Sequence, residues 1–186
     1  YYVEMATRHS IYGRPGACYL DMPDDIIQGE CDLADITQVE RVPEPPKMIA
    51  PTENIEAALD VLESAERPLV LVGKGMAWAH AEDEVRAFID RTQLPFVRSP
   101  MGKGVVPDDH PLAASAARTL ALQQADVVFL MGARFNWIFH FGLPPRFSPD
   151  VKVIQLDISP EEIGHNKPSE VALVGDGKAI MSQMNK

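Results

Sequence analysis

After residue 52 the chain alternates regularly between apolar, strand-like segments and helix-like segments, and this pattern constrains the fold most strongly. The strand-like segments are short apolar runs at residues 69–72, 94–97, 125–132, 151–159 and 170–176. Helix-like segments lie at about residues 53–66, 77–92 and 113–124. Parallel strands joined through helices need right-handed crossovers, and these produce a parallel sheet covered on both faces. The sequence therefore predicts an α/β fold: a Rossmann-like parallel sheet with helices on both faces.

The first 52 residues have a different character and indicate a domain boundary. Residues 1–12 are typical of the end of a helix, and the strand-like residues 17–20 follow a break rich in Gly and Pro. Residues 26–52 hold four prolines within nine positions, which is typical of an extended linker. We predict the end of one domain at residues 1–25, a linker at 26–52 and a second domain at 53–186. Because the chain lacks a first Met and ends within a starting helix, we expect it to be a piece of a longer protein, with the second domain truncated at its C-terminus.

Composition and charge narrow the possible functions. A formal net charge of −10 repels polyanions, so nucleic-acid binding is not expected. No apolar run approaches the ~18 residues that a membrane-spanning helix needs. The two cysteines, Cys18 and Cys31, lack the spacing of a metal site and are too few for a disulfide framework. The five histidines are scattered and predict no zinc site.

The residues that follow each predicted strand are the candidates for ligand binding, because ligands of such sheets lie beyond the carboxyl ends of the strands. Glycines at residues 73, 75, 132, 175 and 177 would let a ligand approach the backbone closely. Lys74 and Arg134 could hold phosphates, and Asp157 could accept the hydroxyl groups of a ribose. A helix beginning near Ala77 would direct its positive end at an anion. In the competing interpretation, the glycines serve tight turns alone and the two cations are solvated.

Several familiar motifs are absent. The dinucleotide-binding motif requires a third glycine where Trp78 stands, after Gly73 and Gly75. Neither 73–75 nor 102–104, both Gly-Lys-Gly, continues with the Ser or Thr of a P-loop. No Ser lies in a nucleophile elbow, and Asp108 and Asp109 are typical turn residues. The aromatic stretch at residues 137–141 is interpreted as a core or interface wedge, with base stacking as the alternative.

Five long blocks carry a resemblance to a known family. They are IYGRPGACYLDMPDD, GKGMAWAHAEDE, PFVRSPMGKGVVPDDHP, GARFNWIFHFGLPPRF and VKVIQLDISPEEI. Together they resemble the 2-hydroxyacyl-CoA lyases, with the oxalyl-CoA decarboxylases as a sister family. Both are thiamine-diphosphate-dependent enzymes of the acetolactate synthase type, and the resemblance covers essentially the whole chain.

The resemblance implies a three-domain parent enzyme. Its N-terminal domain binds the pyrimidine of thiamine diphosphate and its C-terminal domain binds the diphosphate through Mg²⁺. Residues 1–25 would end the first domain and residues 53–186 would form the central one, so no catalytic residue and no metal ligand is expected in this chain. The parent would cleave 2-hydroxyacyl-CoA between C1 and C2, giving formyl-CoA and an aldehyde, as in fatty acid alpha-oxidation.

The resemblance also implies the surroundings of the parent enzyme. It would be a homotetramer that acts on an acyl-CoA, located in the peroxisome of a eukaryote or the cytoplasm of a bacterium. The fragment itself would be an inactive scaffold attached to the remaining domains.

In the decarboxylase branch the central domain carries an ADP site, and by similarity its positions correspond to five residues of this chain. They are Arg14, Lys74, Arg134, Asp157 and Gly177. Four of them also stand at the strand ends chosen above. Met76 and Trp78 are bulkier than expected there. Three alternatives stay open: a decarboxylase fragment, a stand-alone nucleotide-binding module and a structural remnant with an empty site.

Overall fold

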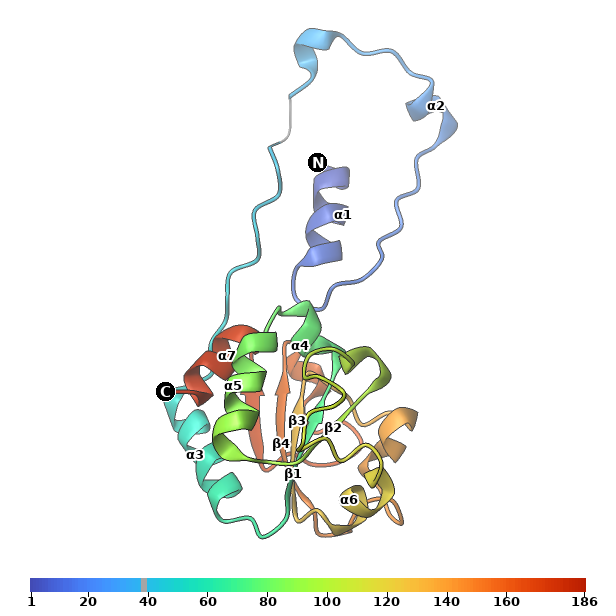
Figure 1. Cartoon of the computed structure of the whole chain (residues 1–186). Coiled ribbons are helices and arrows are strands. Elements are labelled where there is room, and N and C mark those ends of the chain that lie inside the picture. Colours follow the sequence, from blue (N-terminus) through green and yellow to red (C-terminus); the bar gives the residue numbers. More distant parts are fainter. Residues whose placement is uncertain (38–39) are drawn as a thin grey trace. The chain divides into compact units, whose positions relative to one another are not determined.

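The computed structural model describes residues 1–37 and 40–186, and its contacts divide the chain into two units, Tyr1–Pro46 and Lys47–Lys186 (Figure 1). The first unit holds α1 (Tyr2–Ile11), α2 (Asp24–Ile27) and the 3₁₀ turn η1 (Leu33–Asp35), and none of these helices has a buried residue. The division falls within the predicted linker, while the assignment of residues 1–25 to a preceding domain stays a prediction.

The strand expected at residues 17–20 is wrong. These residues have no regular secondary structure, and the Tyr19 side chain is 89% exposed. A strand is stable only when its backbone groups pair with a neighbouring strand, and all five strands among the described residues lie in the second unit.

The second unit is built on a five-stranded, fully parallel sheet with the order β2-β1-β3-β4-β5. Its strands are β1 (Pro68–Val72), β2 (Phe96–Arg98), β3 (Val127–Met131), β4 (Lys152–Asp157) and β5 (Val171–Val174). Every residue of β3 is buried, because this central strand is covered on both faces. The α/β prediction is confirmed.

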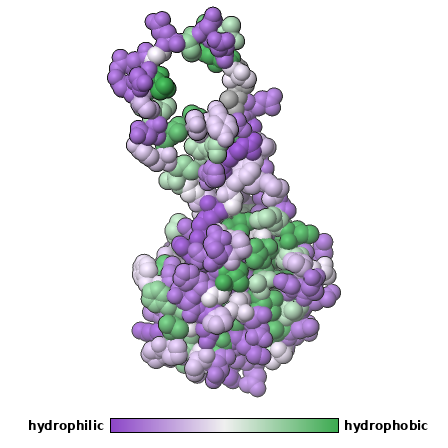
Figure 2. All heavy atoms as spheres, turned by 180° about the vertical axis from the view of Figure 1, so that it is seen from behind, coloured by the Kyte–Doolittle hydropathy of each residue, from purple (hydrophilic) through white to green (hydrophobic). Residues whose placement is uncertain are grey.

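Helices cover both faces of the sheet (Figure 1). One core cluster contains side chains from α3 (Thr52–Glu63), α5 (Glu82–Thr92) and α7 (Gly177–Met184). The other contains side chains from α6 (Arg118–Gln124) and the 3₁₀ segment η3 (Trp137–Gly142). Hydrophilic side chains cover much of the face seen in Figure 2, with apolar ones gathered between them. Within the described residues, no helix is both long and apolar enough to cross a membrane.

Two predicted helices are shorter than expected. The segment 77–92 forms two helices, α4 (Lys74–Trp78) and α5, because His80 adopts a φ of 51° and the Ala81 N–H donates to the Met76 carbonyl. The segment 113–124 becomes helical only at Arg118. In the residues before Arg118, the Ala114 N–H donates to the Phe96 carbonyl at the edge of β2. This hydrogen bond replaces a helical one, so the helix starts later than predicted.

Backbone-to-backbone contact joins the turn after β1 to the end of β3. A Cβ on Gly73 would stand 2.2 Å from the Gly132 carbonyl oxygen, and one on Gly75 would stand 2.7 Å from the Gly132 Cα. Gly132 itself has a φ of +55°, which side chains disfavour. Glycine at these three positions is therefore required by packing.

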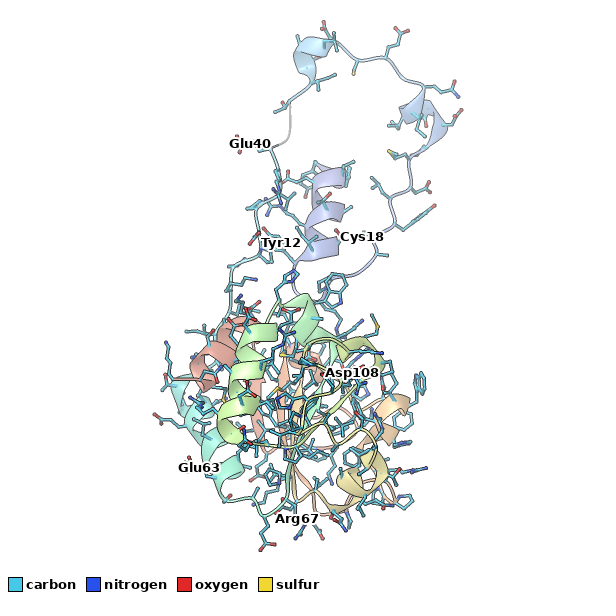
Figure 3. All side chains as sticks on the ribbon, viewed as in Figure 1. Tyr12, Cys18, Glu40, Glu63, Arg67 and Asp108 are labelled. Atoms are coloured by element: carbon cyan, nitrogen blue, oxygen red, sulfur yellow. The ribbon has the colours of Figure 1, made fainter. Side chains whose placement is uncertain are left out.

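Asp126 links β1 and β3 at their opposite, amino ends. Its carboxylate accepts the backbone N–H groups of Glu66 and Arg67 at 2.8 and 2.9 Å. Arg67 is labelled in Figure 3. Burial by itself raises the pKa of Asp126, but these backbone hydrogen bonds outweigh it and hold the pKa below its usual value.

Gly73→Ala is expected to lower the free energy of unfolding by about 1–3 kcal/mol, because the new methyl group must displace backbone. Gly16→Ala is the control, since a Cβ there meets nothing within 4 Å. Urea unfolding of both variants checks the prediction, and equal stability would contradict the packing role of Gly73.

Asp126→Asn is expected to lower stability by about 1–3 kcal/mol at pH 7 and by less as the pH falls. The sign follows from the lowered pKa. Above the unfolded-state pKa of about 3.9 the folded state holds the charged form in its hydrogen bonds, and this stabilisation is lost as acid protonates the folded carboxylate. Unfolding between pH 3 and pH 7 measures it, with the exposed Asp109→Asn as the control. A pH-independent difference would refute the assignment.

Candidate functional site

The carboxyl edge of the sheet carries four of the five residues predicted to bind a nucleotide. Lys74 follows β1, Arg134 follows β3, Asp157 ends β4 and Gly177 begins α7 after β5. The parallel register aligns these strand ends, with Val72 opposite Met131 and Asp157 opposite Val174. Arg14 belongs to the Tyr1–Pro46 unit and lies outside the body that carries the other four.

The backbone N–H groups after β1 are already used within the fold. The Gly73 N–H donates to the Met131 carbonyl at 2.8 Å, and the Gly75 N–H donates to the Gly132 carbonyl at 2.9 Å. The helix begins at Lys74, where the sequence predicted a start near Ala77 that would face an anion. The predicted start near Ala77 is wrong, and the Gly73 and Gly75 N–H groups bind the end of the neighbouring strand rather than a ligand.

Lys74 and Arg134 are the two cations among the residues predicted to bind a nucleotide. No described hydrogen bond or ion pair engages the Lys74 ammonium within residues 1–37 and 40–186. The Arg134 Nη1 lies 3.6 Å from the Glu162 Oε1, and the Arg134 side chain is 42% exposed. The Glu162 side chain is only 15% exposed, so it is the arginine end of this ion pair that is open to solvent.

Asp157 and Gly177 both have structural roles. Asp157 is buried, and its Oδ1 accepts the Ser159 N–H at 3.0 Å, which shapes the turn after β4. A Cβ on Gly177 would stand 2.5 Å from the Met76 Cε, so this glycine lets α7 pack against α4. Asp176 caps α7 through the Ala179 N–H at 2.9 Å and pairs with Lys47 at 3.3 Å. The glycines near α7 are thus explained by packing and capping.

A second group of polar side chains, which the sequence predictions missed, surrounds a cavity of about 240 Å³ beside the carboxyl end of β2. The lining residues are Val97, Arg98, Ser99, Pro100, Lys103, Ser115 and Arg118. They come from β2, the turn η2 (Pro100–Gly102), the loops around it and the start of α6. The sequence did hold one sign of this group, since Arg98 directly follows a predicted strand. Ser115 and Arg118 gave no such sign, because they lie in a segment predicted to be helical throughout.

Across residues 1–37 and 40–186, no three His, Cys, Asp or Glu side chains come together as ligands for a metal ion.

Comparison with known proteins identifies the domain. Residues 55–184 match the family model described as "Thiamine pyrophosphate enzyme, central domain". The chain is 50% identical over 182 residues to human 2-hydroxyacyl-CoA lyase 1, covering 98% of this chain and 32% of that protein. It is 46% identical over 193 residues to the rice 2-hydroxyacyl-CoA lyase, covering 99% of this chain and 33% of that protein.

The sequence identity to a sister enzyme is lower. Escherichia coli K12 oxalyl-CoA decarboxylase is 41% identical over 181 residues, with 96% of this chain and 32% of that protein covered. The chain thus spans about a third of the length of the curated relatives it matches. It belongs to the family of thiamine pyrophosphate enzyme central domains.

Proposed function

We propose that this chain is part of a thiamine-diphosphate-dependent carbon–carbon lyase that cleaves 2-hydroxyacyl-CoA between C1 and C2, giving formyl-CoA and an aldehyde. The observation that carries the proposal is the difference in identity: 50% to the human lyase against 41% to the E. coli decarboxylase, over nearly the same residues. An oxalyl-CoA decarboxylase is the second candidate. Residues 1–25 would end the pyrimidine-binding domain, 26–52 would be the linker and 53–186 the central domain.

Among the described residues, no three His, Cys, Asp or Glu side chains form a cluster that could hold a metal ion. From the family relationship, we propose that the sites for magnesium and thiamine diphosphate lie in other parts of the parent enzyme. Thiamine diphosphate, when bound there, would act as an electron sink for the substrate carbanion. This chain would contribute a rigid parallel sheet whose carboxyl edge presents cationic side chains.

The same family relationship supports proposals about the surroundings of the enzyme. The parent would be a homotetramer that binds an acyl-CoA and takes part in fatty acid alpha-oxidation. It would act in the peroxisome of a eukaryote or in the cytoplasm of a bacterium.

The parent enzyme is expected to release an aldehyde from 2-hydroxyacyl-CoA when thiamine diphosphate and Mg²⁺ are supplied. Aldehyde and CO₂ are measured together, because oxalyl-CoA decarboxylation also gives formyl-CoA but releases CO₂. Turnover of oxalyl-CoA alone would reject the lyase in favour of the decarboxylase. The 186-residue chain alone is expected to form no formyl-CoA, and turnover by it would overturn the division of roles.

We also propose that the carboxyl edge binds an ADP-type nucleotide. The convergence of Lys74, Arg134 and Asp157 at one edge supports this, as does the 42% exposure of the Arg134 side chain. Because the Gly73 and Gly75 N–H groups are in use, the side chains of Lys74 and Arg134 would bind the phosphates in this proposal. Arg14 stays a candidate contributor by similarity alone.

ADP at one hundred times its dissociation constant is expected to add about 2.7 kcal/mol to the stability of the chain. Lys74→Ala should remove this gain without changing the stability of the ligand-free chain, since no described contact engages its ammonium. Lys152→Ala, at the exposed start of β4 on the opposite edge, is the matched control. Asp157→Ala is a poor probe, because losing the Ser159 hydrogen bond destabilises the fold by itself. Thermal unfolding reports both effects, and no gain with ADP would leave this site empty.

A further inference from the structure

Four large apolar side chains lie exposed on α6 and on the segment that begins with η3. They are Leu120, Trp137, Phe141 and Leu143. Trp137 is the most exposed of the four, at 73%. Single exposed apolar residues are normal on a protein surface, but a group of them that includes aromatic residues is typical of an interface. Together with Arg146, we call these residues the α6–η3 face.

Hydrogen bonds join the two segments into one surface. Arg146 Nη1 donates to the Thr119 Oγ1 at 3.2 Å, and Gln123 Nε2 donates to the Pro145 carbonyl at 3.2 Å. Thr119 and Gln123 belong to α6, whereas Pro145 and Arg146 follow η3. Leu120 lies three positions before Gln123, so both residues stand on neighbouring parts of the helix surface. The exposed side chains of both segments are therefore presented by one packed unit.

The backbone of η3 adopts a conformation that side chains disfavour. His140 and Phe141 have φ values of 49° and 56°, in the left-handed region. Asn136 holds this conformation, because its carbonyl accepts the Phe141 N–H at 2.9 Å and its Oδ1 accepts the Ile138 N–H at 3.0 Å. Backbone strain of this kind tends to persist at binding sites, and here it leaves the Phe141 side chain at the surface.

The charge of the face is opposite in sign to the formal net charge of the chain, which is −10. Between residues 110 and 149 the only acidic residue is Asp126, although the whole chain has 27. Asp126 lies at the amino end of β3, where it binds backbone N–H groups of the turn before β1. Arg146 is exposed, and within residues 1–37 and 40–186 no described ion pair engages its guanidinium. The face is therefore apolar and cationic.

These properties decide between the surfaces that could cover the face. A symmetric dimer would place the same face of two copies together, so that the two Arg146 side chains would share one interface and repel each other. The chain spans about a third of the length of its relatives, so a parent enzyme of that length has ample polypeptide outside these residues. A part of the parent that carries apolar side chains and carboxylates would match both properties of the face.

We propose that the α6–η3 face binds another part of the same parent enzyme, through a surface that is apolar and carries carboxylates. Trp137 and Phe141 would be buried at the centre of this contact, and Arg146 would pair with a carboxylate at its rim. No residue of the face lines the cavity beside β2. The inference rests on the proposal that the chain belongs to a longer enzyme, but not on which substrate that enzyme takes.

Hydroxyl-radical labelling read by mass spectrometry tests the proposal. The 186-residue chain and the parent enzyme are labelled under the same conditions, without substrate. Trp137 is expected to be oxidised about tenfold more slowly in the parent, because a side chain at the centre of an interface is shielded from water. Arg67, exposed at the amino end of β1, is the internal control and should be labelled equally in both.

Substitutions give a second, independent measurement. Trp137→Ser is expected to leave the urea midpoint of the 186-residue chain unchanged, because the side chain is exposed there, and to lower the midpoint of the parent. Arg146→Glu should lower the midpoint of the parent as well, since it places a negative charge against carboxylates. Lys152→Ser, at the exposed start of β4, is the matched control and should change neither midpoint.

Equal oxidation of Trp137 in the chain and in the parent would overturn the proposal. Protection that appears only when an acyl-CoA is added would also overturn it, because the face would then bind a ligand. Protection in the chain alone that increases with its concentration would assign the face to a second copy instead. Protection in a parent that cleaves neither 2-hydroxyacyl-CoA nor oxalyl-CoA would support this inference while rejecting the proposed reaction.

Discussion

The close approach of two backbone segments, the turn after β1 and the end of β3, is the constraint on which the carboxyl edge of the sheet depends. Gly73 and Gly75 meet Gly132 at distances that no Cβ could occupy. This contact lets α4 cross the edge, and Met76 then packs beside Gly177 at the start of α7. Strands β1 and β5 are not neighbours, yet the segments that follow them touch. The glycine-rich appearance of the edge is thus a consequence of packing.

This constraint also determines which groups remain for chemistry. The Gly73 and Gly75 N–H groups donate to the Met131 and Gly132 carbonyl groups, so these two donors are not available to a ligand. Lys74 and Arg134 follow β1 and β3 and could contact a ligand. Arg98, Lys103 and Arg118 line the cavity beside the carboxyl end of β2. An acidic chain therefore concentrates cations at the end of the sheet where α/β proteins bind ligands.

Particular residues show where reasoning from sequence succeeded and where it failed. The continuous apolar run of β3 identified a fully buried strand, because a short segment that is apolar throughout suits a parallel strand covered on both faces. The helix expected from Ala113 failed, since the open edge of β2 pairs with Ala114 through a bond that local propensity cannot anticipate. Reasoning from sequence missed the residues that line the cavity beside β2 for a similar reason. Arg98 and Ser115 are 17 positions apart, and only the return of the chain along β2 brings them to 2.6 Å.

The sequence by itself determined the fold class, the five strands of the sheet and the family, because these depend on hydrophobic periodicity and on long matching blocks. It also identified Lys74, Arg134 and Asp157 as strand-end residues. Only the tertiary structure decided what each group does there: which glycines are packing contacts, that Asp157 shapes a turn, and that three distant cations share one cavity. The physical reason is that a site depends on distances between segments remote in sequence. Those distances are set by sheet order and backbone approach, which a one-dimensional pattern does not contain.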